Sequence, residues 1–311
     1  MLAVGDGYVI AGTVQSDDGD DAEILLLRVD ADGNEIWWNP FGTPLNEHGG
    51  RLIQTEDDGY VIIGNCVDPN DIVADPGAAR YAGFAGRSNA YLVKTDAAGN
   101  EVWSRRFETD ENVIASGVEM AADGGIVLLT HILHYPVDDN DIRLFKVDGD
   151  GNEIWSRTWK EGKASGYDLI ATSDGGFLIS GLRSFPEDPA RAKADALLIK
   201  VDSEGNETWL TTYGEPDMVE TAHAVTETAD GHYVCVGWQE RDLYSYTDNL
   251  LLAAFDADGV LLWEDVTRRT VHTTFGAILG HPDGSYVVIG SAARPGSPFR
   301  VQVIKIDPGG T

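Results

Sequence analysis

Seven residues near the start of strand-like segments carry side chains suited to acid–base chemistry. A histidine beside a carboxylate exchanges protons near neutral pH, and a tyrosine adds a hydroxyl group. No pair of these residues recurs at a spacing that such chemistry demands, so we predict a binding rim without catalytic residues. The candidate binding residues are Glu47, His48, Tyr167, Asp168, Glu220, His223 and His272.

Metal chemistry is disfavoured at two other motifs. His131 and His134 are three residues apart, which on a strand points them to opposite faces and prevents joint chelation. The acidic runs 30–35 and 148–153 resemble calcium loops, but their glycine stands at position 4 instead of the position 6 of an EF-hand. Because hairpin turns explain these residues, we predict no cofactor, and calcium remains the less favoured alternative.

The two cysteines, Cys66 and Cys235, belong to no CxxC motif. They lie far apart in the repeat described next, so the sequence predicts neither a zinc site nor a disulfide.

The elements that must position these residues are repeats. One motif reads Asp-Gly-aromatic-apolar-apolar-x-Gly or a close variant, and its six copies begin at Asp6, Asp58, Asp123, Asp174, Asp230 and Asp283. A second motif, an apolar run followed by Asp-x-x-Gly and a tryptophan, has five complete copies ending at Trp37, Trp103, Trp155, Trp209 and Trp263. One large aromatic residue per repeat in the same register predicts packing between repeats.

Each repeat contains four short segments of alternating hydrophobicity, bounded by Asp, Gly and Asn. This pattern predicts antiparallel strands joined by tight hairpins. Four strands in a unit of about 50 residues indicate an all-β, six-bladed β-propeller of four-stranded blades. We predict one domain, 1–311, with blades at about 1–40, 48–107, 115–159, 165–213, 222–267 and 273–311.

The first and last predicted blades are incomplete. Blade 1 keeps only residues 1–4 of its first strand, and blade 6 stops before its fourth strand. Either blade 6 is three-stranded or the chain is part of a longer protein, and the start of the chain inside a repeat favours the second interpretation.

The strand order and the closing pattern Asp-x-x-Gly-Asn-Glu-x-Trp resemble quinoprotein-like (PQQ-like) propeller blades. They are also similar to archaeal and bacterial surface proteins with repeated DGGYxVxG and KxDxxGNxxW motifs. This resemblance implies that the first strand lines a central channel and that the tryptophan strand lies outermost. Quinone enzymes of this kind have eight blades and adjacent cysteines, so we do not expect quinone binding here.

Charge restricts the partners. The chain has 311 residues, 52 Asp and Glu, 22 Lys and Arg, and a net charge of −30. Such a charge repels nucleic acid and anionic membranes. It also destabilises a compact fold unless salt screens it, which predicts a halophilic, haloarchaeal source. An ordinary acidic protein is the alternative.

The long, variable connections all emerge on one face, because the tight hairpins share the other. Variable loops on a rigid scaffold commonly bind ligands. We therefore predict a non-catalytic module, at the cell surface or secreted, that binds a protein or a glycan through the long-loop face. The alternatives are a polysaccharide hydrolase or lyase acting at the channel mouth and, for location, the cytoplasm of a high-salt organism. No apolar run is long enough to cross a membrane, and we expect a monomer or part of a longer chain.

Overall fold

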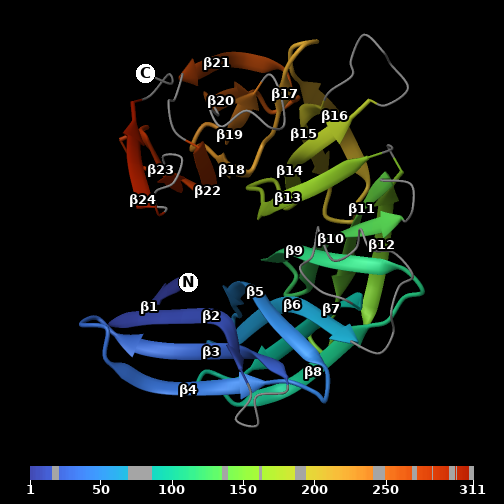
Figure 1. The fold of residues 1–311 in the computed structure, drawn as a ribbon, viewed down its shortest axis with the longest axis vertical. Coiled ribbons are helices and arrows are strands. Elements are labelled where there is room, and N and C mark those ends of the chain that lie inside the picture. The colour runs from blue at the N-terminus through green and yellow to red at the C-terminus, as the bar shows by residue number, and fades with distance from the viewer. Residues whose placement is uncertain are drawn as a thin grey trace. The chain divides into compact units, whose positions relative to one another are not determined.

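The structure is a computed structural model that describes residues 1–15, 21–68, 86–134, 139–160, 163–185, 194–240, 249–267, 272–281, 283–293, 298 and 300–307. Every regular element in these ranges is a β-strand, as Figure 1 shows. None of the described segments forms a helix that could span a bilayer.

Residues Met1–Trp159 form one compact unit with three antiparallel sheets. Blade 1 consists of β1 (Leu2–Val4), β2 (Gly7–Gln15), β3 (Ala22–Asp30) and β4 (Glu35–Phe41). Blade 2 consists of β5 (Asn46–Gln54), β6 (Tyr60–Asp68), β7 (Arg87–Thr95) and β8 (Glu101–Phe107). Blade 3 consists of β9 (Asn112–Met120), β10 (Ile126–His134), β11 (Asp139–Val147) and β12 (Glu153–Trp159).

Residues Lys160–Thr311 form the second compact unit. Blade 4 consists of β13 (Ala164–Ala171), β14 (Phe177–Ser184), β15 (Ala194–Val201) and β16 (Glu207–Tyr213). Blade 5 has a first strand split into β17 (Val219–Glu220) and β18 (Ala224–Glu227), followed by β19 (Tyr233–Glu240), β20 (Asn249–Phe255) and β21 (Leu261–Thr267). Blade 6 has three strands, β22 (His272–Gly280), β23 (Tyr286–Ala293) and β24 (Arg300–Ile306).

The sequence of six small antiparallel sheets confirms the predicted class, an all-β, six-bladed β-propeller. Both predicted irregularities are present in the described residues. The first strand of blade 1 has only three residues, and the sheet of blade 6 has only three strands.

An aspartate organises the hairpin between the third and fourth strands. Asp30 Oδ1 accepts hydrogen bonds from the backbone N–H groups of Asp32 (2.9 Å) and Asn34 (2.8 Å). The side-chain and backbone bonds from Asn34 lower the pKa of Asp30, and Gly33 supplies the left-handed conformation at φ 82°. Equivalent turns start at Asp96, Asp148, Asp202 and Asp256. Turn chemistry therefore accounts for the runs that resemble calcium loops.

A recurrent ion pair connects the first hairpin of a blade with its third strand. Lys146 Nζ lies 2.7 Å from Asp123 Oδ2, and Lys200 Nζ lies 2.8 Å from Asp174 Oδ2. Further pairs are Arg28–Asp6, Lys94–Asp57 and Lys305–Asp283. In blade 2 the counterpart of Asp123 is thus Asp57, one residue before the aspartate of the sequence motif.

An extra residue interrupts several first strands and explains the last glycine of the Asp-Gly motif. Tyr167 is such a residue, because the pairing with β14 passes directly from Gly166 to Asp168. The bulge brings Ser165 O so close to Gly181 that a Cβ atom there would lie 2.0 Å away. Only glycine leaves room for the neighbouring backbone at this position.

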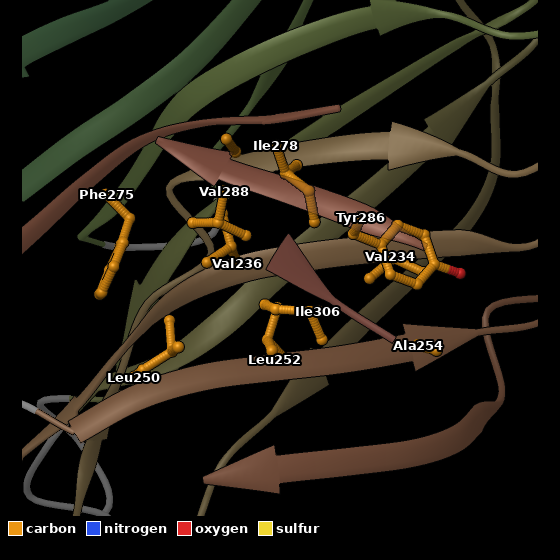
Figure 2. Packing of buried hydrophobic residues seen from close by; sticks show 11 residues of the cluster. Val234, Val236, Leu250, Leu252, Ala254, Phe275, Ile278, Tyr286, Val288 and Ile306 are labelled. Atoms are coloured by element: carbon orange, nitrogen blue, oxygen red, sulfur yellow. The ribbon is translucent and has the colours of Figure 1, made fainter. Parts of the chain in front are cut away.

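Apolar residues bury the faces between neighbouring blades of a unit. One cluster joins blades 5 and 6 through side chains that include Val236, Leu252, Phe275, Val288 and Ile306, as Figure 2 shows. Corresponding clusters join blades 1 and 2, blades 2 and 3, and blades 4 and 5. Alternation along the strands thus supplies one face to each neighbour.

Three of the repeated tryptophans, Trp37, Trp103 and Trp209, lie against the hairpin of the following blade. Trp103 Nε1 donates a hydrogen bond to Gly149 O at 2.9 Å, and Trp209 Nε1 donates to Ala257 O at 2.9 Å. Their indoles cover the turn glycines Gly151 and Gly259, where a Cβ atom would contact the ring. These tryptophans are only half-buried, so each connects two blades at the rim of the core.

Candidate functional site

Two of the predicted binding carboxylates lie inside the protein. Glu47, on β5, is fully buried and accepts hydrogen bonds from Thr43 N (3.1 Å), the Thr43 hydroxyl and the Cys66 thiol (3.2 Å). Burial and the neighbouring Glu47 raise the pKa of Cys66 to about 12, so the thiol remains a donor. Glu47 therefore holds the connection between blades 1 and 2 and cannot contact a ligand.

Glu220, on β17, occupies the equivalent position in blade 5. It is fully buried, and its Oε1 accepts hydrogen bonds from Glu215 N (3.2 Å) and Gln239 Nε2 (3.0 Å). Burial, and to a smaller extent the charges of Asp195 and Glu215, raise the pKa of Glu220 to about 7. A group with this pKa suits acid–base chemistry, but the carboxyl is closed to solvent and therefore to a substrate.

Asp168 is the third carboxylate with a structural role. It is buried on β13, and its Oδ2 accepts a hydrogen bond from Val225 N on the next blade at 3.1 Å. Val225 lies on β18, the second part of the first strand of blade 5, so this hydrogen bond connects blades 4 and 5.

Two of the histidines predicted to bind, His48 and His272, lie on different blades. His48 is half-buried on β5 opposite Asn65, and burial lowers the pKa of His48 although Glu47 opposes the shift. His272 begins β22, and its side chain lies outside the described residues.

Tyr167 and His223 meet on neighbouring blades and form the centre of the candidate site. Their rings are stacked, with centroids 4.6 Å apart and an angle of 5° between the planes. Trp238, on β19, extends the group, because its Nε1 donates a hydrogen bond to His223 Nε2 at 3.0 Å. All three residues are partly exposed to solvent. We call Tyr167, His223 and Trp238 the aromatic cluster.

The environment of His223 defines its protonation. Burial lowers the pKa of His223 to about 4, so the imidazole is neutral at neutral pH. Since Nε2 accepts the bond from Trp238, the ring proton resides on Nδ1. His223 therefore offers a fixed Nδ1–H donor and a flat ring surface. Its Nε2 already accepts the hydrogen bond from Trp238.

The backbone explains why the side chains of Tyr167 and His223 depart from the regular alternation of their strands. Tyr167 is the bulged residue of β13, and His223 lies in the interruption between β17 and β18. Bulges redirect side chains away from the regular alternation of a strand. The aligned repeats predict both residues at the start of a first strand. They do not single out Trp238, although its position three residues before the long connection 241–248 is a signal in the sequence.

The other histidines, the cysteines and the long connections that the sequence analysis singled out are not part of the aromatic cluster. His134 Nε2 contacts Asp141 Oδ2 at 2.9 Å, while burial lowers the pKa of His131, its neighbour on β10, to about 4. Both cysteines are buried and free. The long connections 69–85, 186–193 and 241–248 of the predicted binding face lie outside the described residues.

No family model matches the sequence, and no curated protein matches it. The fold is similar to solved structures. One is a protein of unknown function from Bacteroides caccae, with 10% identity, a TM-score of 0.53 and coverage of 98% of this chain and 92% of that chain. Another, of unknown function from Dyadobacter fermentans, has 12% identity, a TM-score of 0.57 and coverage of 83% and 79%.

A third similar structure is an ulvan lyase of polysaccharide lyase family PL25, bound to -[GlcA(1-4)Rha3S]-. Its identity is 10%, its TM-score is 0.59, and the match covers 94% of this chain and 74% of that chain. At such low identities the three comparisons establish the shared fold alone.

Proposed function

We propose that this protein is a non-catalytic binding module that recognises a glycan through the aromatic cluster. The observation that carries the proposal is the half-buried stack of Tyr167 on His223, joined to Trp238 by a hydrogen bond. Flat aromatic surfaces pack against the C–H faces of sugar rings, and nearby polar groups orient the hydroxyls. The Tyr167 hydroxyl and His223 Nδ1–H are polar groups of this kind.

The charge of the protein favours a neutral glycan. A net charge of −30 repels polyuronates and sulfated polysaccharides at low salt. The groups of the aromatic cluster are themselves uncharged at neutral pH, so they offer no cation to an acidic sugar. A neutral polysaccharide is not repelled by the negative charge of the protein.

A polysaccharide lyase or hydrolase is the second candidate. It is supported by the fold shared with the ulvan lyase and by the phenol and imidazole of Tyr167 and His223, which are groups that acid–base catalysis uses. We prefer the binding module because His223 Nε2 is occupied by Trp238 and the shifted carboxyl of Glu220 is fully buried.

Binding and turnover of neutral polysaccharides distinguish the two candidates. We expect calorimetric titration to detect binding without new reducing ends or unsaturated products. Tyr167→Ala and Trp238→Ala should each weaken binding at least tenfold, whereas Tyr167→Phe should weaken it much less, because it removes one polar contact and keeps the ring. Tyr8→Ala removes an exposed tyrosine of blade 1 and is the matched control.

Two results would contradict the binding module. Product release that Tyr167→Phe abolishes would establish the enzyme instead. Equal binding by the wild type and both alanine variants would show that the aromatic cluster does not bind the glycan.

We also propose a high-salt, cell-surface or secreted setting and a relationship with PQQ-like repeat proteins. The acidic composition and the repeated Asp-x-x-Gly-Asn-Glu-x-Trp pattern support these proposals. Labelling of intact cells with an antibody tests the location, because a cytoplasmic protein would be stained only after lysis.

A further inference from the structure

Hydrogen bonds join the buried carboxyl group of Glu220 to the aromatic cluster. Glu220 stands opposite Gln239 in the pairing of β17 with β19, and Gln239 Nε2 donates to Glu220 Oε1 at 3.0 Å. The next residues along the two strands are also bonded, because Thr221 N donates to Trp238 O at 3.0 Å. Trp238 in turn holds His223 through its indole N–H group. The segment that carries the aromatic cluster is therefore continuous with the pairing that Glu220 makes.

The carboxyl group of Glu220 is poorly placed to carry a charge. The residue is fully buried, and its Oε2 atom makes no hydrogen bond. Asp195 Oδ1 and Glu220 Oε2 lie 2.6 and 2.8 Å from the same point, which is the position that a Cβ atom of Gly214 would occupy. Two carboxyl groups around one point repel each other when both are ionised. The geometry therefore favours a proton on Glu220.

Most of the charged groups around Glu220 are acidic. The strands that pack against β17 are β15, which carries Asp195, and β19, which carries Glu240. Glu215, in the connection before β17, donates its backbone N–H to Glu220 Oε1 but adds a carboxylate. The cationic Arg183 lies opposite Asp195 in the pairing of β14 with β15. Burial, with smaller contributions from the charges of Asp195 and Glu215, raises the pKa of Glu220 to about 7.

We propose that Glu220 regulates the aromatic cluster, which binds its ligand while Glu220 is protonated and loses affinity when Glu220 ionises. This inference rests on the proposed binding of a glycan. Loss of the proton leaves a buried carboxylate whose Oε2 atom has no donor, a costly state unless the carboxyl group moves towards water. Because Glu220 ends β17 and its partner Gln239 adjoins Trp238, such a movement disturbs the interruption that carries His223.

The sign of the pH dependence follows from linkage. A ligand that binds the protonated form better must also make Glu220 hold its proton more tightly. Binding is therefore tightest below the pKa of Glu220 and weakens as the pH rises through about 7. The pKa of His223 is about 4, so its imidazole stays neutral between pH 5.5 and 8.5 and does not cause the change.

The indole N–H resonance of Trp238 tests the coupling without a ligand. It is assigned by its absence from Trp238→Phe and followed by NMR in the full chain from pH 5.5 to 8.5. We expect a shift with a midpoint near 7 in the wild type, because Glu220 titrates there. Glu220→Gln keeps an acceptor for Gln239 but does not titrate, so the shift should be absent. Glu264→Gln removes an exposed carboxylate of the same blade and should behave like the wild type.

Calorimetric titration tests the effect on binding. The probes are three neutral polysaccharides, laminarin, xyloglucan and galactomannan, each added at pH 5.5 and at pH 8.5. For a polysaccharide that binds at pH 5.5, we expect the wild type and Glu264→Gln to bind about fivefold more weakly at pH 8.5. Glu220→Gln should bind with the same affinity at both pH values.

The two measurements separate this inference from the proposed function. An indole resonance that does not titrate, or that titrates equally in Glu220→Gln, would overturn the inference. Equal affinity of the wild type at pH 5.5 and 8.5 would also overturn it, while the binding module would stand. If none of the three polysaccharides binds but the resonance titrates through Glu220, the glycan is rejected and the control of the aromatic cluster by Glu220 is retained.

Discussion

The connections into blades 2 and 5 use the same parts and differ in their chemistry. Each begins with a glycine, Gly42 or Gly214, and each ends with a fully buried glutamate, Glu47 or Glu220. A Cβ atom on the glycine would lie 3.0 Å from Glu47 Oε2 in one connection and 2.8 Å from Glu220 Oε2 in the other. The two carboxyl groups thus occupy equivalent places in different surroundings.

The hydrogen-bond donors around Glu47 and Glu220 explain the difference between the two connections. Glu47 receives a backbone N–H, a hydroxyl and a thiol, with both oxygens bonded. In blade 5 the position of Thr43 is taken by Glu215, which provides no hydroxyl and adds a charge, and Glu220 Oε2 has no partner. A buried carboxylate needs donors to remain charged, and burial with few donors raises the pKa of Glu220 to about 7.

Salt should have the largest effect and should separate buried from surface carboxylates. Between about 0.1 and 2 M KCl we expect the free energy of unfolding to rise by several kcal/mol, because screening removes surface repulsion. Urea denaturation at each salt concentration measures it. The difference between wild type and Glu220→Gln at a given pH should change little, since buried groups are poorly screened. A stability that is flat with salt would contradict the halophilic prediction.

Removal of the well-bonded carboxylate should have the next largest effect. Glu47→Ala leaves the amide of Thr43 without its acceptor and should destabilise the protein by about 3 kcal/mol. Urea denaturation in high salt measures the loss. Glu56→Ala, which removes an exposed glutamate of the same blade, is the control and should change stability by less than about 0.5 kcal/mol. Equal effects of the two substitutions would refute the structural role of Glu47.

The pH dependence tests Glu220 directly. Its pKa is raised in the folded state, so the folded protein holds the proton more tightly, and stability falls as pH rises from about 5 to 8. Glu220→Gln removes the titrating group and should be more stable than wild type by on the order of 2 kcal/mol at pH 8. Unfolding curves at several pH values give the slope, and identical slopes for the two proteins would disprove the shift.

A single exchange should make the blade 5 connection resemble that of blade 2. Glu215→Thr supplies the hydroxyl donor that Glu47 already has and removes a neighbouring charge, so the pKa of Glu220 should fall. We expect a gain of about 1 kcal/mol at pH 8. The carboxyl carbon shift of Glu220 in an NMR titration follows the pKa, and an unchanged midpoint would show that burial alone raises it.

Local signals predicted most of the fold. The turns at Asp30 and its counterparts, the alternating strands and the incomplete sixth blade all depend on residues within a few positions of one another. The bulges were not predicted, because they follow from two strands that approach at Gly181. In blade 2 the sequence motif points to Asp58, whereas Asp57 makes the ion pair, because Asp58 itself adopts the left-handed conformation of a glycine, at φ 60°.

The candidate site was predicted only in part. Tyr167 and His223 were named as separate positions, and nothing in their spacing of 56 residues reveals that the rings stack. The sequence predicts Glu47 and Glu220 at a rim because both lie near the start of a first strand. The structure buries both, since each satisfies backbone donors of a connection between blades.

The sequence by itself determined the repeat, the strand pattern and the acidic surface, because hairpin chemistry and alternation act between close neighbours in the chain. Only the tertiary structure decided which acidic groups are buried and which ring faces Tyr167. Those properties depend on side chains and strands that different blades bring together, so no local pattern encodes them.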